Sequence, residues 1–572
     1  MIYNKFNKVK RALVAACLLP LGTCLFSGCS DFLDILPMNE VVLENYWTQK
    51  SDVTSVLNGC YETLEHTDCI TRMGIWGELR SDNLRLGSSV PNEINEILKE
   101  NLIPTNPYCN WGKFYEAINR CNTVIYYAPD VQAIDPNYSM AEMQADIAEA
   151  KCIRALCYFY LIRTFRDVPY STEPSIDDTK TYVVAATPFN KVLQNLINDL
   201  ESCKDQALRR FYPDDSPNAY QNSSRITRCA IYALLADLYL WANDWDHAIE
   251  NCNRVIDFKK QQYKEMRERE GNVNTIGLFA GIPLLLEKPS GSNVCGNAYT
   301  EIFGVGNSFE SIFELYFATN QSQENTWVNT YYGNRNSTMG RLSMPDFLRK
   351  EVPQGTNSIF KKTDGRAYAC AEVIDSRYAI AKYVRTSYRY SNQSISTEAS
   401  LNASSSVRSS ANANWIIYRL TDMLLIKAEA MIERGEGTDY EDAFTLINAV
   451  NKRSNDVTTT TRTDTLKMAD YVKNDSTSRL NLEELLFEER QREFLFEGKR
   501  WFDLVRMARR DGNNTRLVTL ASRKYIENVN VIKIKLANPD IIYFPYAKSE
   551  LKVNPLLKQN SAYGNTETSV IK

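Results

Sequence analysis

The chain of 572 residues carries 66 lysines and arginines against 70 aspartates and glutamates, a formal charge of −4 with a pI near 5.7. This balance argues against a dedicated nucleic-acid binder, which would show a basic footprint. Only two histidines are present, His66 and His247, so catalytic triads and metal sites built from histidine are excluded as classes.

The N-terminus has the pattern of a secretory signal. Four basic residues lie between positions 5 and 11, and an apolar stretch covers residues 12–26. This stretch is too short and too interrupted to span a bilayer, and no later apolar run reaches the length of a spanning helix. It ends in Leu25-Phe26-Ser27-Gly28-Cys29, which resembles a bacterial lipobox. We therefore expect residues 1–28 to be removed and Cys29 to carry palmitate or related acyl chains that anchor the protein to a membrane. An ordinary cleaved signal is the alternative.

Helical patterns dominate the first half of the chain. Apolar residues recur at helical spacing in five segments, and residues 225–241 are apolar almost all round, so neighbouring elements must enclose that helix. A short turn joins it to the next helix, and such antiparallel pairs resemble tetratricopeptide repeats. We expect helices over residues 111–127, 141–166, 188–203, 225–241 and 246–257.

The middle of the chain has a different character. Between residues 271 and 415 helical patterns become rare, Gly, Asn, Ser and Tyr become frequent, and 391–414 form a tract without periodicity. Short runs at 311–317 and 378–384 predict strands. After this region two helices recur at 420–433 and 440–453, and the alternation at 532–536 predicts an edge strand. The fold class is therefore mainly α, with tetratricopeptide-like repeats, a long irregular insertion and minor β structure.

Eleven cysteines follow Cys29, none of them in a CxxC pair. Several fall inside apolar helical stretches, so we expect small buried hydrophobic side chains and no disulfide framework.

Motifs along nearly the whole chain resemble the SusD/RagB family of nutrient-uptake lipoproteins from Gram-negative outer membranes. The resemblance implies an α-α superhelix and a surface lipoprotein that captures nutrient, usually a glycan, for a SusC-like TonB-dependent transporter. Each motif alone is modest, but their order is specific. They are residues 29–34 (CSDFLD), 148–150, 154–161 (RALCYFYL), 167–169 (DVP), 418–422, 427–430, 448–453, 489–506 and 544–560.

Residues 482–506 concentrate carboxylates and could suggest a glycoside hydrolase. On a helical wheel Glu489, Glu493 and Asp503 share one face with Arg492 and Arg500. Hydrolysis needs one protonated acid beside an ionised partner, whereas interleaved arginines keep carboxylates charged. We therefore interpret this segment as a structural helix held by an ion network, without catalytic residues.

A saccharide site needs aromatic faces and polar side chains that reach hydroxyl groups. Two clusters outside the periodic helices combine these features, whereas Trp111, Trp241 and Trp501 lie on apolar helical faces and are assigned to the core. A role as structural anchors is the alternative for every aromatic side chain in the two clusters. The candidate ligand-binding residues are Trp76, Asp82 and Arg85 in one cluster and Trp327, Tyr331 and Tyr332 in the other.

We expect a lipid-anchored protein on the exterior of the Gram-negative outer membrane that binds glycan, without a cofactor, metal, nucleic acid or catalytic activity. The chain would divide into the signal at 1–28, a SusD-like helical-repeat region at 29–270, a loop-rich ligand region at 271–415 and a C-terminal SusD/RagB region at 416–572. Three alternatives stay open. The same fold could bind peptides, a surface hydrolase would need two carboxylates about 5–10 Å apart in an open cleft, and a pure assembly scaffold would bury Trp327, Tyr331 and Tyr332.

Overall fold

The computed structural model describes residues 46–176, 183–292, 294–318, 324–334, 339–349, 358–360, 364–391, 403–455, 466–473 and 475–564. The signal, the proposed lipidation site Cys29 and the motif at 29–34 lie outside these residues. None of the helices in the described ranges is long and apolar enough to cross a membrane.

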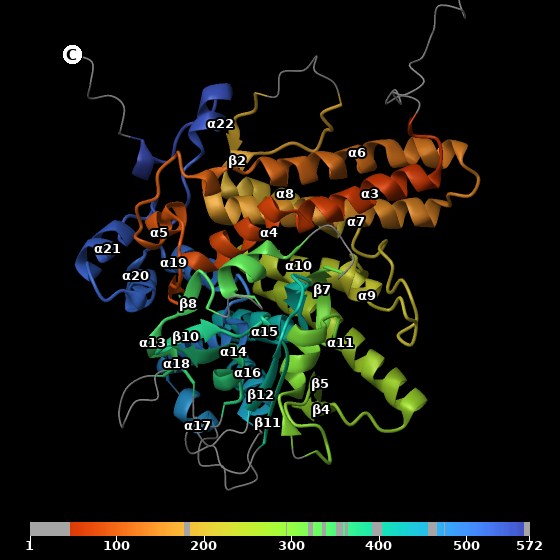
Figure 1. Cartoon of the computed structure of the whole chain (residues 1–572). Helices are drawn as coiled ribbons and strands as arrows, with labels where there is room; N and C mark the ends of the chain where they lie inside the picture. The colour runs from red at the N-terminus through yellow and green to blue at the C-terminus, as the bar shows by residue number, and fades with distance from the viewer. Residues whose placement is uncertain are drawn as a thin grey trace, which may run out of the picture.

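Antiparallel helix pairs form the body of the molecule (Figure 1). Helix α6 packs between α3 and α7, and α11 packs between α10 and α15, so the pairs continue from one to the next. All the helices expected in these regions are confirmed, and two of them, α6 and α11, extend well beyond their expected ends. The pairs are α3 (Lys50–Glu65) with α6 (Gly112–Ile134), α7 (Met140–Phe165) with α8 (Phe189–Glu201), α10 (Arg228–Trp241) with α11 (Trp245–Glu270), and α15 (Leu420–Arg434) with α16 (Asp439–Asn455).

Local sequence explains where these helices begin and end. Ser139 accepts a hydrogen bond from the backbone N–H of Glu142, whose side chain bonds back to Ser139, so α7 starts in a capping box. The same helix ends at Phe165, just before the predicted stop at Asp167-Val168-Pro169. Gly435 ends α15 in the left-handed conformation, with a φ of 65° that glycine adopts without strain.

The β structure is minor and antiparallel. Strands β1 (Arg85–Leu86), β8 (Leu342–Met344), β10 (Arg377–Ile380) and β9 (Ala371–Ile374) form one sheet in this order. A second sheet has the order β12 (Ala403–Val407), β11 (Arg385–Ser391) and β6 (Val294–Cys295). The predicted strand at 311–317 is confirmed over β7 (Ser311–Leu315), whereas that at 378–384 is confirmed only for 378–380 in β10, because residues 382–384 form a turn. The two-stranded sheets are β13 (Trp415–Arg419) with β7 (Ser311–Leu315), β2 (Val168–Pro169) with β3 (Ala186–Thr187), and β4 (Ile276–Phe279) with β5 (Ile282–Leu285).

Short helices and turns connect these elements. The segment 532–536 belongs to helix α21, so the predicted edge strand is wrong. Ile532 and Leu536 are buried four residues apart while Ile534 is exposed, which is helical spacing that the alternating sequence concealed. The remaining helices are α4 (Thr67–Gly74), η2 (Ile75–Leu79), α5 (Asn92–Leu98), η3 (Pro107–Cys109), α9 (Gln221–Ser224), α12 (Asn297–Tyr299), η4 (Thr300–Val305), η5 (Trp327–Tyr332), α13 (Asp346–Arg349), α14 (Arg366–Cys370), α17 (Met468–Tyr471), α18 (Thr477–Phe494), α19 (Arg500–Asp511), α20 (Thr515–Ala521), η7 (Ser522–Lys524), α21 (Val529–Leu536), α22 (Lys548–Val553) and η8 (Ser561–Tyr563).

One core of buried side chains draws on every region of the described chain. Eleven cysteines, from Cys60 to Cys370, are buried, and no disulfide joins any two of them in the described part of the chain, which confirms the expectation of small hydrophobic side chains. Residues Trp111, Trp241 and Trp501 are buried as well, as their positions on apolar helical faces predicted.

Candidate functional site

The first predicted aromatic cluster lies inside the protein. Trp76 is fully buried in η2, its ring packs against Phe114 and Phe165, and its indole N–H donates to the carbonyl of Tyr108 at 3.0 Å. Trp76 is one of the candidate ligand-binding residues, and its burial agrees with the alternative role as a structural anchor, because the ring fills the space between the first helix pairs. A ring that is covered by protein presents no face to a sugar.

The polar members of that cluster differ from each other. The carboxylate of Asp82, another candidate ligand-binding residue, is fully buried and accepts from Nε of Arg500 at 2.9 Å, so it presents no surface to a ligand. Arg85 lies in β1, its side chain is 23% exposed, and it forms an ion pair with Asp346 at 2.7 Å. Ligand binding by Arg85 stays a prediction.

The second predicted cluster forms helical turn η5 rather than a loop. Trp327 and Tyr332 have no exposed surface and Tyr331 is 5% exposed. The Tyr332 hydroxyl donates to the carbonyl of Phe496 at 2.9 Å, and the hydroxyls of Tyr331 and Tyr108 lie 2.7 Å apart. A Cβ at Gly74 would lie 2.2 Å from the Trp327 ring, which shows how closely α4 packs on it. The expected exposure is wrong for all three rings, and their burial is what the scaffold alternative predicted.

The carboxylate-rich segment 482–506 is two helices, so the single helix we expected is wrong. Helices α18 and α19 are separated by a turn in which Phe496 and Gly498 have φ values of 67° and 72°. Glu78 holds this turn by accepting from the backbone N–H groups of Phe496 and Lys499, each at 3.1 Å. The turn therefore depends on a buried carboxylate more than 400 residues earlier in the chain.

The predicted ion network around these helices is confirmed. Glu493 accepts from Arg419 and Arg453 at 2.5 Å each and from Arg366 at 2.7 Å. Although burial opposes ionisation, these guanidinium groups hold the pKa of the Glu493 carboxyl well below its ordinary value. Glu489 is buried beside Arg366, and its pKa is lowered for the same reason. Neither carboxyl group is suited to act as a protonated general acid.

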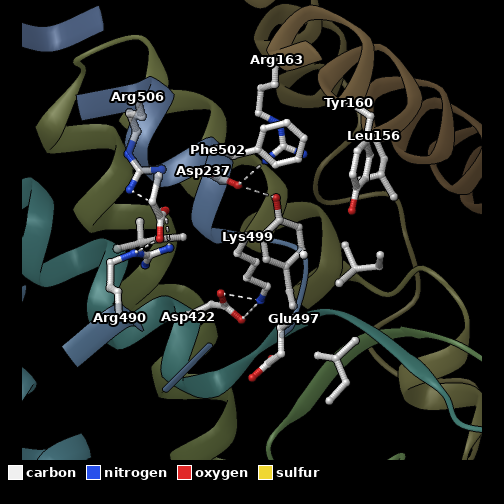
Figure 2. A pocket seen from close by; sticks show the side chains of 16 residues that line it. Leu156, Tyr160, Arg163, Asp237, Asp422, Arg490, Glu497, Lys499, Phe502 and Arg506 are labelled. Carbon is white, nitrogen blue, oxygen red and sulfur yellow. Dashed lines mark hydrogen bonds and ion pairs between the residues drawn. The ribbon is translucent and has the colours of Figure 1, made fainter. Parts of the chain in front are cut away.

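A buried cavity of about 30 Å³ lies next to this network (Figure 2). Its carboxylates face cations, as with Asp422 and Nζ of Lys499 at 2.6 Å and Asp503 and Arg490 at 2.8 Å. Burial opposes ionisation, but the neighbouring cations lower the pKa values of Glu497 and Asp503 to about 2. A cavity of this size has room for about one water molecule, so it cannot admit a sugar ring for hydrolysis.

An open groove of about 540 Å³ offers a ligand surface that the sequence did not identify. Its walls come from the segment before α10, the C-terminal half of α11 and the stretch around β7. Among the lining residues Tyr220 and Tyr316 stack with centroids 4.8 Å apart and ring planes at 27°, and both side chains are half-buried. Neighbouring charged residues supply hydrogen-bonding groups. The arrangement combines aromatic surface with polar groups in a hollow large enough for a small ligand.

The charges of this groove are mostly paired. Arg210 lies 2.8 Å from Glu265 and 3.7 Å from Asp214, and Arg269 lies 2.7 Å from Glu270. At the floor Nζ of Lys259 donates to backbone carbonyls at 2.7 and 2.9 Å, and burial lowers its pKa. Both groove carboxylates, Asp214 and Glu270, therefore face arginines. This pairing suits binding better than acid–base catalysis.

Two family models match successive parts of the chain. The model described as "Starch-binding associating with outer membrane" matches residues 31–240, and the model described as "SusD family" matches residues 310–563. The chain belongs to the SusD family. Proteins of this family are binding proteins, not enzymes as a family, and they associate with the outer membrane. The family resemblance and the mainly α fold class predicted from the sequence are both confirmed.

Relatives cover nearly the whole chain at low identity. SusD-like protein P38 of Formosa agariphila is 23% identical over 98% of this chain and 100% of the relative. A SusD-like protein of Bacteroides ovatus is 22% identical over 87% of this chain and 82% of the relative. Among solved structures, a SusD superfamily protein of Bacteroides thetaiotaomicron aligns with a TM-score of 0.63 at 18% identity, over 90% of this chain and 100% of that one. A SusD superfamily protein of Bacteroides vulgatus aligns with a TM-score of 0.61 at 19% identity, over 91% and 100%.

The open groove uses both matched and unmatched parts of this SusD-family chain. Tyr220 lies in the region matched by the first family model and Tyr316 in that matched by the second. Between them, residues 241–309 are matched by neither of these two models, and they supply the C-terminal half of α11 and the start of the facing wall. The groove therefore joins elements that the two family models match to a stretch that neither of them matches.

Proposed function

We propose that this protein is a lipid-anchored receptor on the exterior of the outer membrane that binds nutrient glycan and delivers it to a SusC-like TonB-dependent transporter. The observation that carries the proposal is the open groove with its stacked tyrosines, on a fold whose family model is described as starch-binding. The lipobox-like segment ending at Cys29 supports the anchor. The proposal includes the division of the chain into a signal at 1–28, a helical-repeat region at 29–270, a loop-rich ligand region at 271–415 and a C-terminal region at 416–572.

The groove suits a saccharide for physical reasons. Each ring of the Tyr220–Tyr316 pair covers one face of the other and leaves further ring surface for a sugar. Charged side chains on the walls can exchange hydrogen bonds with hydroxyl groups while keeping their ionic partners. Nothing in this arrangement requires a cofactor or a covalent step.

Peptide binding by the same groove is the second candidate. A charge-rich lining favours a peptide, and six charged residues line the groove, namely Arg209, Arg210, Asp214, Lys259, Arg269 and Glu270. The stacked tyrosines favour a glycan, so the two ligand classes compete for one surface. A surface hydrolase has less support, because the groove carboxylates are paired with arginines and the buried cavity admits only water.

Calorimetric titration of lipid-free protein comprising residues 30–572 tests the proposal. The ligands are soluble polysaccharides, host glycans and a peptide mixture, and the samples are assayed afterwards for new reducing ends. We expect saturable heat with a glycan and no product. Tyr220→Ala and Tyr316→Ala should each weaken binding about tenfold, the equivalent of about 1.4 kcal/mol. The matched control is Tyr126→Ala, which removes an exposed ring on α6, outside the groove.

Three results would change the proposal. Heat with peptides alone would select the second candidate, and released oligosaccharide would indicate a hydrolase. Glycan binding that survives both tyrosine substitutions would place the site elsewhere. For the transporter, co-purification of a TonB-dependent barrel with the anchored protein is expected, and its absence would contradict that part of the proposal.

A further inference from the structure

A second open pocket, also of about 540 Å³, lies between α8, the C-terminal end of α10 and α19. Three arginines line it, Arg506, Arg509 and Arg510, and no acidic residue is among its lining residues in the described chain. Its other polar groups include the side-chain amides of Asn190 and Gln194. The pocket is therefore lined by cations and by groups able to donate hydrogen bonds, unlike the charge-paired groove.

The three arginines are not equivalent. Arg506 is held by Glu429 at 2.6 Å, and Arg510 by the same carboxylate at 3.0 Å, so both charges are compensated from behind the pocket wall. Arg509 has no carboxylate partner among the residues that the structure describes. Its guanidinium donates to the Tyr543 hydroxyl at 2.9 Å and to Oδ1 of Asn190 at 3.1 Å.

Arg509 is also held in place. Its guanidinium lies 3.7 Å from the centre of the Phe189 ring, a stacking contact that restrains the planar, fork-shaped guanidinium group. A positioned and uncompensated guanidinium is the group that best recognises a planar or tetrahedral oxyanion, because it donates two parallel hydrogen bonds.

Trp241 closes one side of the pocket. Its side chain lines the pocket and is 6% exposed, while its indole Nε1 is buried within the protein. The ring therefore contributes apolar surface beside the guanidinium groups, a combination that small-ligand pockets share.

We propose that this pocket binds the anionic group of an acidic sugar unit, a carboxylate or a sulfate ester. Arg509 takes the oxyanion, and the amides of Asn190 and Gln194 bond hydroxyl groups. The volume falls in the range of small-ligand pockets. The choice of a sugar as the carrier of the charge rests on the proposed function, whereas the binding of an anion follows from the pocket itself.

Titrations with four probes test this assignment on lipid-free protein 30–572. They are an oligogalacturonate, a sulfated dextrin, a neutral maltooligosaccharide and tetraglutamate. We expect binding of one or both acidic glycans that weakens with added salt. Arg509→Met should reduce that affinity about tenfold or more. Arg509→Lys should keep part of it, because it retains the charge and loses the fork.

A second variant does not depend on removing Arg509. Asn190 is exposed on α8 and its Oδ1 already touches the guanidinium, so Asn190→Asp places a carboxylate against Arg509 and should abolish acidic-glycan binding without disturbing the fold. The matched control is Arg523→Met, which removes another exposed arginine that also stacks on a ring, that of Phe347. Thermal melting of each variant verifies folding.

The outcomes separate the two proposals. Acidic-glycan affinity unchanged in Arg509→Met and Asn190→Asp overturns the pocket assignment. Equal binding of tetraglutamate overturns the choice of a sugar as the carrier of the charge. Binding of the neutral probe alone, sensitive to Tyr220→Ala, overturns the pocket and supports the groove. If no glycan binds at all, the proposed function fails together with this inference. The comparison of the carboxylated with the sulfated probe identifies which anion the pocket takes.

Discussion

Replacing Glu493 by glutamine tests whether the buried ion network stabilises this fold. The carboxylate is 3% exposed and lies among three guanidinium groups, those of Arg366, Arg419 and Arg453. Glutamine keeps the size and shape of the side chain but removes its charge. The amide oxygen carries no full negative charge, and the NH2 group that replaces the other carboxylate oxygen cannot accept a hydrogen bond, so the three bonds together lose about 3 kcal/mol. The buried cluster also gains an uncompensated positive charge, so we expect a destabilisation of about 3–5 kcal/mol.

The assay is urea unfolding followed by tryptophan fluorescence and far-ultraviolet circular dichroism. The matched control is Glu488→Gln on the same helix, whose side chain is 63% exposed and lies 3.4 Å from Arg492. Because exposed pairs contribute little, this variant should lose less than about 1 kcal/mol. Equal midpoints for Glu493→Gln and Glu488→Gln would refute the reasoning, since they would show that the buried network contributes no more than a surface pair.

The dependence on pH sharpens this test. The pKa of Glu493 lies well below its ordinary value in the folded protein. Its charge therefore stabilises the fold above the unfolded pKa, near 4.5, and that contribution is lost as the pH falls toward the folded pKa. The difference in stability between wild type and Glu493→Gln should shrink steadily below about pH 4.5. A constant difference would contradict an electrostatic origin.

Further predictions concern packing and titration. Gly77→Ala should destabilise the protein by about 1–3 kcal/mol, because the new Cβ would lie 1.9 Å from the backbone carbonyl of the facing turn. The denaturant midpoint measures the effect. Gly112→Ala is the control, since its Cβ would lie 3.2 Å from the nearest atom. Glu497 and Asp503, with pKa values lowered to about 2, should make the melting temperature fall as the pH drops from about 4.5 to 2; a flat profile would contradict the lowered values. Burial lowers the pKa of Lys524 to about 8 in the folded protein. Between about pH 8 and 10.5 only the unfolded chain keeps this lysine protonated, so the stability of the fold should rise with pH across that range. Lys524→Met should abolish this part of the rise in melting temperature.

Helix positions could be predicted from sequence because the signal is local. The apolar spacing and the turn residues of α10, α15 and α16 lie within each segment, and the expected bounds agree with the structure to within a few residues. The segment 532–536 shows the limit of such reasoning. Five residues fit both a strand and a helix, and only burial of Ile532 and Leu536 on one side decides between them.

The break between α18 and α19 depends on contacts that no local pattern contains. The sequence 495–499 continues a helical wheel, but Glu78 captures two of its backbone N–H groups, and Gly77 allows the chains to approach closely. The burial of Trp327 has the same origin, because Gly74 and Thr71 of α4 lie against η5. An aromatic residue in an irregular stretch therefore looks the same in sequence whether it faces solvent or fills a distant gap.

Both open hollows are assembled from distant segments, which is why the sequence did not reveal them. Tyr220 and Tyr316 stack although their local sequences share no motif, and Arg509 meets Asn190 across more than 300 residues. The family motifs at 148–150, 154–161, 427–430, 448–453 and 489–506, by contrast, fall in the helices and ion network that make the scaffold. The two family models describe the scaffold, but neither matches residues 241–309. Ligand choice in this chain would then depend on residues such as those of 241–309. Exchanging surface residues of the groove wall should accordingly change which ligand binds while leaving the melting temperature within a few degrees of wild type. A set of variants in which ligand binding and melting temperature always change together would contradict this separation of binding from stability.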